Sequence, residues 1–240
     1  MARAGIPILA VLIDADNSSP QWAEAIFEEI AALGEASVRR IYGDFSRSAL
    51  KGWSDRLAGL ALVPHHSPAN TVGKNASDIA LVIDAMDLLH SGRFDGFVLI
   101  SSDSDFTRLA SRIREQGLDV YGIGQQKTPE AFRKACKRFI FVENLMPTIP
   151  EDVPKAEREK AAKKEPPASA AVLIEHAMRA IGGEDEWYSL GQIGQFIVAA
   201  NPDFDVRSYG SSKLSDLVAK TGRFEMKRGE GNQTFVRARG

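Results

Sequence analysis

Short apolar runs alternate with helical patterns over roughly the first 145 residues of the chain. Each run is followed by apolar positions at the spacing of an amphipathic helix, which is typical of strands joined by helices. The strands that this pattern predicts are residues 8–13, 38–42, 60–63, 97–100, 120–123 and 139–142. Strands separated by helices imply a mostly parallel sheet covered on both faces, so we expect an α/β fold.

The helix predicted from residue 75 to about residue 90 carries several acids. Asn75 is its expected N-cap. The apolar stripe expected to face the sheet is Ile79, Val82, Ile83, Met86 and Leu89. On a helical projection Asp78 lies at the buried edge of this stripe, whereas Asp84 lies nearly opposite and is expected to face solvent.

The pattern changes after residue 147. Residues 148–168 are charged, proline-flanked and almost free of apolar side chains, which predicts a linker between a domain at 1–147 and a second domain at 169–240. In the second domain, Ser189 and Gln192 form an expected capping box at the start of a helix. Three short helices and a hairpin with a turn at 229–232 indicate a small winged helix-turn-helix domain.

Composition narrows the class of protein further. The 240 residues are 44% hydrophobic and 26% charged with a net charge of −2, so no global basic charge indicates nucleic acid. A single cysteine, Cys136, excludes an internal disulfide and suits the cytoplasm. No apolar run approaches the about 20 residues of a membrane helix, so we expect no membrane partner.

Acidic residues follow two of the predicted strands and begin one helix. Asp14 and Asp16 follow the first strand, Asp103 and Asp105 follow the fourth, and Asp78 lies on the central helix. The carboxyl ends of parallel strands meet at one edge of a sheet, where these acids would converge. Clustered carboxylates repel one another unless a cation neutralises them, and hard Mg²⁺ or Mn²⁺ prefers oxygen ligands. This arrangement predicts a cation site able to activate water against a phosphodiester.

Each acid also has a structural explanation. An N-cap at Asn75 would make Asp78 a favourable third residue of its helix, and a first-turn acid would explain Asp103 or Asp105, although less easily both. Asn17 orients a scissile phosphate or is a turn residue. Asp16 supports the site or caps a helix. Asp14 is the hardest to explain without a ligand, because a strand end gives a carboxylate no partner of its own.

Other candidate residues are less specific. His65 and His66 have no further ligand at metal-binding spacing, and Cys136 is expected in the core. In the C-terminal domain basic residues with an aromatic among them suit nucleic acid. The candidate RNA-binding residues there are Arg207, Tyr209, Lys213, Lys227 and Arg228. A winged domain also serves for docking of proteins, and this alternative stays open.

The first domain resembles the NYN domain, a PIN-like ribonuclease fold also known from LabA-like proteins. The matching stretches are Val11-Leu12-Ile13-Asp14-Ala15-Asp16-Asn17, Lys74-Asn75-Ala76-Ser77-Asp78 and Leu99-Ile100-Ser101-Ser102-Asp103-Ser104-Asp105-Phe106. The resemblance implies that Asp14, Asp78 and Asp103 bind Mg²⁺ or Mn²⁺ for RNA hydrolysis, with Asp105 and Asn17 beside them.

The tail resembles the OST-HTH or LOTUS domain through Ser189-Leu190-Gly191-Gln192 and the run from Pro202 to Leu214. That family is linked to RNA binding, and some members bind a helicase instead. The pairing implies a metal-dependent ribonuclease, with endonucleolytic cleavage expected, whose tail holds RNA. The rival is a non-catalytic RNA-binding or regulatory adaptor. A protein partner of the tail and a homodimer of the chain also stay open.

Overall fold

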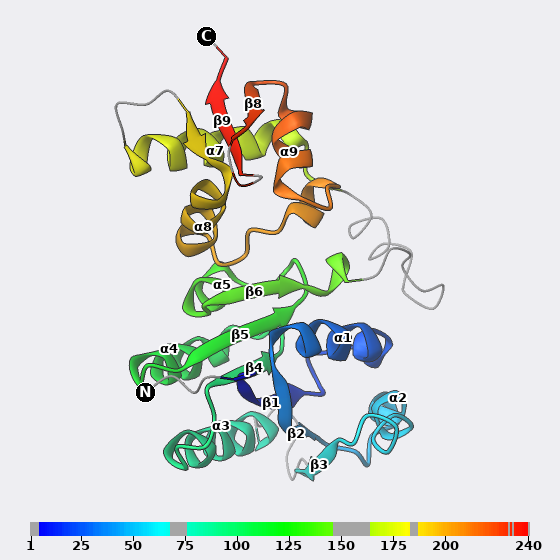
Figure 1. Cartoon of the computed structure of the whole chain (residues 1–240). Helices are drawn as coiled ribbons and strands as arrows, with labels where there is room; N and C mark the ends of the chain where they lie inside the picture. Colours follow the sequence, from blue (N-terminus) through cyan, green and yellow to red (C-terminus); the bar gives the residue numbers. More distant parts are fainter. Residues whose placement is uncertain are drawn as a thin grey trace. The chain divides into compact units, whose positions relative to one another are not determined.

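The computed structural model describes residues 5–67, 76–145, 164–182, 187–229, 231 and 233–239. It divides into two compact units, residues 1–152 and 153–240. Figure 1 shows both units coloured along the chain.

The first unit contains a six-stranded sheet in which every neighbouring pair of strands is parallel. Its strands are β1 (Ile8–Asp14), β2 (Glu35–Gly43), β3 (Val63–His66), β4 (Gly96–Ile100), β5 (Asp119–Gly124) and β6 (Arg138–Phe141). Their spatial order is β3-β2-β1-β4-β5-β6. β1 and β4 are therefore central neighbours, and their residues 9–13 and 96–100 are buried on both faces of the sheet.

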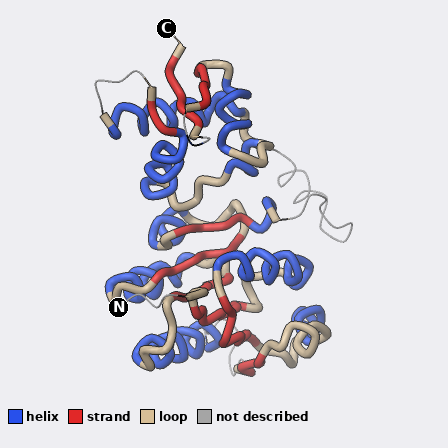
Figure 2. Tube along the Cα trace, viewed as in Figure 1, coloured by secondary structure: helices blue, strands red, loops and turns tan. Residues whose placement is uncertain are grey.

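Helices cover both faces of this sheet (Figures 1 and 2). Its helical segments are η1 (Pro20–Trp22), α1 (Ala23–Leu33), η2 (Ser48–Leu50), α2 (Lys51–Ser54), α3 (Ala76–His90), η3 (Ser104–Phe106), α4 (Thr107–Glu115), α5 (Glu130–Ala135) and η4 (Val142–Asn144). Leu9, Val11 and Ile13 pack with α1 and α2, whereas Ala10 and Leu12 pack with α3, α4 and α5. The alternation of β1 side chains thus joins two separate cores, and the predicted α/β class is confirmed.

The third strand differs from the prediction. It runs from Val63 to His66 and includes Pro64, whereas residues 60–62 form a turn in which Ala61 has a positive φ. β3 is an edge strand, where proline is tolerated because one side of the strand needs no hydrogen-bond partner.

The second unit is a helical domain with a small sheet. Its elements are α7 (Pro167–Ile181), β7 (Tyr188–Ser189), α8 (Leu190–Ala200), η5 (Val206–Tyr209), α9 (Leu214–Thr221), β8 (Phe224–Arg228) and β9 (Thr234–Ala238). Three helices and the β8–β9 hairpin agree with the predicted winged helix, and β7 adds a third strand in the order β7-β9-β8. α7 begins two residues inside the predicted linker. Ser189 is the N-cap of α8 as predicted, but its side chain makes no capping hydrogen bond.

Candidate active site

The candidate site lies where β1 and β4 end side by side. α1 follows β1 on one face of the sheet, and α4 follows β4 on the other face. Because the chain leaves these two adjacent strands toward opposite faces, a crevice forms outside the carboxyl ends of the strands, where open α/β sheets bind their ligands. Ile13 pairs with Ile100, so the residues that follow them, Asp14 and Ser101, lie side by side.

Asp14 is the buried centre of this edge. This residue is only 1% exposed to solvent. Oδ1 accepts hydrogen bonds from the backbone N–H of Asp16 at 3.1 Å and of Asn17 at 3.2 Å, and Oδ2 accepts one from Ser101 Oγ at 2.6 Å. Burial raises the pKa of Asp14, while the hydrogen bonds from Ser101 and Asn17 oppose that rise. The carboxylate therefore fixes the loop that carries the neighbouring acids.

Ser101 links the two strand ends. This residue is 2% exposed, donates to Asp14 and accepts a hydrogen bond from the backbone N–H of Asp103 at 3.0 Å. No role for Ser101 follows from the sequence pattern. The signal available was the pairing of the first and fourth strands, which places residue 101 beside residue 14, but that pairing is not readable from periodicity alone.

Asp103 and Asp105 both lie in the turn after β4. Asp103 is the N-cap of η3, and its Oδ1 accepts the backbone N–H of Asp105 at 2.9 Å. The capping explanation therefore holds for Asp103, and Asp105 is exposed in the first turn of η3, where an acid is favourable in any case.

The pKa of Asp78 shows that the neighbouring acids influence this residue. It lies in the first turn of α3 and is half-buried. Partial burial raises its pKa to about 6, helped by the negative charges of Asp14, Asp103, Asp16 and Asp105. The three acidic stations predicted from the sequence thus act on one another electrostatically. The predicted cap of this helix, Asn75, lies outside the described residues.

The buried face of α3 matches the predicted one only in part. Leu89 is buried, and Val82 and Met86 pack against the core, as predicted. Leu81, Ala85, Leu88 and Leu89 are buried, whereas Ile79 and Ile83 are 60% and 56% exposed. The helix has apolar residues on almost all sides, so periodicity did not single out one face. Asp78 is still placed correctly, because it precedes Leu81 by three residues and shares its face.

Asp84 does not point to solvent, contrary to the prediction. Its Oδ2 lies 2.8 Å from Arg40 Nη1, 2.8 Å from the hydroxyl of Tyr42 and 3.2 Å from His65 Nδ1. Burial and the adjacent Asp84 carboxylate raise the pKa of Tyr42. These contacts, which we call the Asp84 clamp, tie α3 to β2 and β3.

Asp16 and Asn17 complete the loop after β1. Asp16 Oδ2 accepts a hydrogen bond from Ser77 Oγ at 3.4 Å, and Asp16 Oδ1 lies 3.5 Å from Arg47 Nη1. The loop is thereby joined to the first turn of α3. Asn17 is exposed, and its side chain also hydrogen-bonds Asp14.

The donor set fits a hard divalent cation. Asp14, Asp78 and Asp103 offer carboxylate oxygens, the ligands that Mg²⁺ and Mn²⁺ prefer. The raised pKa of Asp78 reflects burial first and then the negative charge of its neighbours, which a cation would neutralise. Among the described residues, no group of three or more His, Cys, Asp or Glu side chains is gathered closely enough to hold an ion.

The candidate residues of the C-terminal domain divide into two kinds. Arg207 is held by Asp205 through Nε at 2.9 Å and Nη2 at 2.6 Å. Tyr209 is 9% exposed, and burial together with Glu165 raises its pKa to about 12. These two side chains thus serve the domain's own structure. Lys213, Lys227 and Arg228 are exposed.

Cys136 has no place in the site. It is fully buried, and its Sγ lies 3.3 Å from the carbonyl oxygen of Phe132. Burial raises the pKa of the thiol to about 12, so it is a core residue, as expected.

These observations define an α/β domain with an acidic edge at its topological switch point, followed by a winged helix-turn-helix domain. The chain belongs to the NYN domain family, whose model matches residues 8–143, and the OST-HTH/LOTUS domain model matches residues 167–236. The first unit accordingly has a PIN-like α/β fold of the kind found in nucleases, and the OST-HTH/LOTUS family is linked to RNA binding.

No curated protein matches the chain. One solved structure that it resembles is described as a protein of unknown function, VPA0982, from Vibrio parahaemolyticus RIMD 2210633. The two are 19% identical, the match covers 59% of this chain and 96% of that one, and the TM-score is 0.49. In the part of the chain that the structure describes, no helix is long and apolar enough to cross a bilayer.

Proposed function

We propose that this protein is a divalent-cation-dependent ribonuclease. The observation that carries the proposal is that four other carboxylates, at the sheet edge where Asp14 is buried, act electrostatically on the half-buried Asp78. Negative charge beside a buried acid destabilises the fold when no cation neutralises it, so folding alone does not explain these carboxylates. Membership of the NYN family supports phosphodiester hydrolysis as the use of this charge.

In this proposal Asp14, Asp78 and Asp103 hold Mg²⁺ or Mn²⁺. When bound, the cation supplies Lewis acidity at the scissile phosphate. Asp105, exposed two residues after Asp103, accepts the proton of the attacking water. Asn17 donates an amide hydrogen bond to a phosphate oxygen. Hydrolysis then leaves one phosphomonoester end and one hydroxyl end, with the proton passing to the leaving oxygen.

The C-terminal domain retains RNA near the cleaving domain in this scheme. RNA is the partner that its OST-HTH/LOTUS family supports. We expect cleavage within the RNA chain and a cytoplasmic site of action. Docking of a protein on this domain, and self-association of the chain, are the competing uses of its surface.

The test is cleavage of labelled single-stranded RNA by the purified chain with Mn²⁺. We expect internal fragments with Mn²⁺, none with EDTA, and a rate at least about a hundredfold lower for Asp103→Asn, because a lost ligand removes the bound cation. Equal cleavage by Asp103→Asn would point to a contaminating nuclease and overturn the proposal. Asp87→Asn, an exposed acid on α3, is the matched control.

One observation favours a second function, that of a non-catalytic RNA-binding adaptor. Asp14 and Asp103 both stabilise the loops after their strands by accepting hydrogen bonds from backbone N–H groups. The described acids do not form a metal site. A chain that binds RNA but neither binds Mn²⁺ nor cleaves would be this adaptor.

A further inference from the structure

The small sheet of the C-terminal domain has two different faces. Phe224 and Val236 point inward and are 4% and 0% exposed in the core formed with α7, α8 and α9. Residues directly opposite each other in antiparallel strands share a face, and so do alternate residues along a strand. The pairs Glu225–Arg237 and Lys227–Phe235 therefore lie on the opposite face.

Trp187 joins that second face from the neighbouring strand. It lies two residues before Ser189, which pairs with Phe235. Lys227 Nζ lies 4.2 Å and Arg237 Cζ 4.8 Å from the centroid of its ring. We call the set Trp187, Glu225, Lys227, Phe235 and Arg237 the outer face of the sheet. Lys227 is exposed, and the other four are half-buried.

We propose that this outer face binds single-stranded RNA, with a base stacked on Trp187 and the neighbouring phosphate on Lys227. The proposal rests on RNA as the ligand of the C-terminal domain and names the surface and form of RNA involved.

The chemistry of the face favours this ligand. Aromatic rings on a sheet offer stacking surfaces for unpaired bases, whereas cations between them hold the backbone. From residue 223 to residue 239 the chain has five basic residues and two acidic ones. Lys227 can turn from the indole to a phosphate at little cost, because an exposed cation–π contact contributes only about 0.5–1 kcal/mol.

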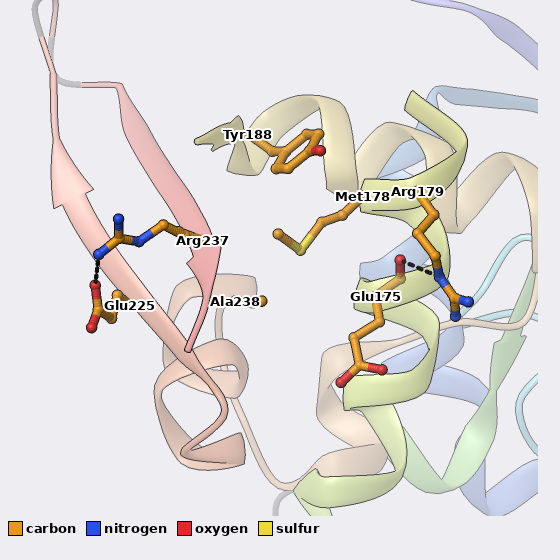
Figure 3. Close-up of a pocket in the computed structure, with 7 residues that line it drawn as sticks. All are labelled: Glu175, Met178, Arg179, Tyr188, Glu225, Arg237 and Ala238. Atoms are coloured by element: carbon orange, nitrogen blue, oxygen red, sulfur yellow. Dashed lines mark hydrogen bonds and ion pairs between the residues drawn. The ribbon is translucent and has the colours of Figure 1, made fainter. Parts of the chain in front are cut away.

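The outer face continues into a cavity of about 750 Å³ (Figure 3). Arg237 and Glu225, joined by an ion pair of 2.6 Å, line one side, and Met178 and Tyr188 lie across from them. Glu175 and Glu225 repel a phosphate here, but their carboxylates can accept hydrogen bonds from the amino group of a base. The cavity is thus suited to a base next to the stacked one, with the backbone passing on the Lys227 side.

Intrinsic fluorescence provides a selective test, because the chain has three tryptophans. Trp22 and Trp53 are 4% and 0% exposed in the first unit, so stacking of RNA would act on Trp187. The full chain is titrated with a short single-stranded RNA of mixed sequence in EDTA, which withholds the cation that cleavage needs. We expect quenching on binding, and loss of that quenching in Trp187→Phe.

Affinity is measured in parallel by the anisotropy of labelled RNA. We expect Trp187→Leu to bind about tenfold more weakly, as for loss of one stacked base. Lys227→Gln should lower the slope of log affinity against log salt by about 0.7, the value for one phosphate of a single strand. Lys220→Gln, an exposed basic residue in the last turn of α9 and outside the outer face, is the matched control and should change affinity less than Lys227→Gln. Circular dichroism confirms that each variant is folded.

The proposal is overturned if RNA does not bind, if it binds without quenching, if a duplex binds more tightly, or if Lys220→Gln weakens binding more than Lys227→Gln does. Failure of the ribonuclease proposal is distinct from these results. Quenching by RNA in a chain that cleaves nothing with Mn²⁺ leaves this inference standing, and cleavage without quenching does the reverse.

Discussion

Ser101 Oγ donates a hydrogen bond of 2.6 Å to Oδ2 of Asp14, and both residues are buried at the ends of adjacent parallel strands. The same oxygen of Ser101 accepts the backbone N–H of Asp103. One hydroxyl therefore positions two of the three carboxylates assigned to the cation site.

Removal of this hydroxyl should destabilise the domain. Ser101→Ala leaves a buried carboxylate and a backbone N–H each short of one partner, and we expect a loss of about 2 kcal/mol in the free energy of unfolding. Urea denaturation measures this loss. Ser104→Ala, an exposed neighbour, should change stability by less than about 0.5 kcal/mol. A Ser101→Ala protein as stable as the wild type would contradict the assigned role.

Asp78→Asn should stabilise the cation-free protein near neutral pH. The pKa of Asp78 is about 6 in the folded state against 3.8 for an ordinary aspartate, so folding disfavours its ionised form. The stability linked to its protonation is complete below pH 3.8 and is lost as the pH rises toward 6. The advantage of Asp78→Asn should therefore be largest near neutral pH and should shrink toward acid.

Thermal unfolding in EDTA across this range is the measurement. Asp87→Asn on the same helix is the control and should show no such trend. An Asp78→Asn protein that melts below the wild type near neutral pH would argue against repulsion at this site.

The Asp84 clamp should hold α3, and with it Asp78, in place. Asp84→Ala removes the acceptor shared by Arg40 and Tyr42, and hydrogen bonds to a charged group contribute about 1.5–3 kcal/mol. We expect a loss of about 2 kcal/mol, together with faster hydrogen exchange of the α3 amides in mass spectrometry. Asp87→Ala, exposed on the same helix, should leave both unchanged. Exchange in α3 equal to that of the wild type would show that the clamp is dispensable.

The sequence predicts the sheet well because each strand is a short apolar run followed by a helical pattern. It also predicts that Asp14 and the acids after β4 lie at the same edge, because strand ends of a parallel sheet share an edge. The role of Ser101 depends on which strands are neighbours, and that order is a tertiary property.

Errors arose where local patterns were ambiguous. α3 is apolar on nearly every side, so the stripe with Ile79 and Ile83 appeared as plausible as the one with Leu81 and Ala85. The same ambiguity leads to the wrong prediction that Asp84 faces solvent. Its partners lie on β2 and β3, and their proximity is not visible in the sequence of α3. The basic residues around Tyr209 favour RNA binding, whereas its ring lies in a small core with Ala170 and Leu217.

Calorimetric titration of the purified chain with Mn²⁺ tests most directly whether the acidic edge of the sheet binds a cation. We expect binding to the wild type that is lost in Asp103→Asn and in Asp78→Asn but retained in Asp87→Asn. Absence of Mn²⁺ binding, or binding that Asp103→Asn leaves unchanged, would contradict a cation site at the acidic edge of the sheet.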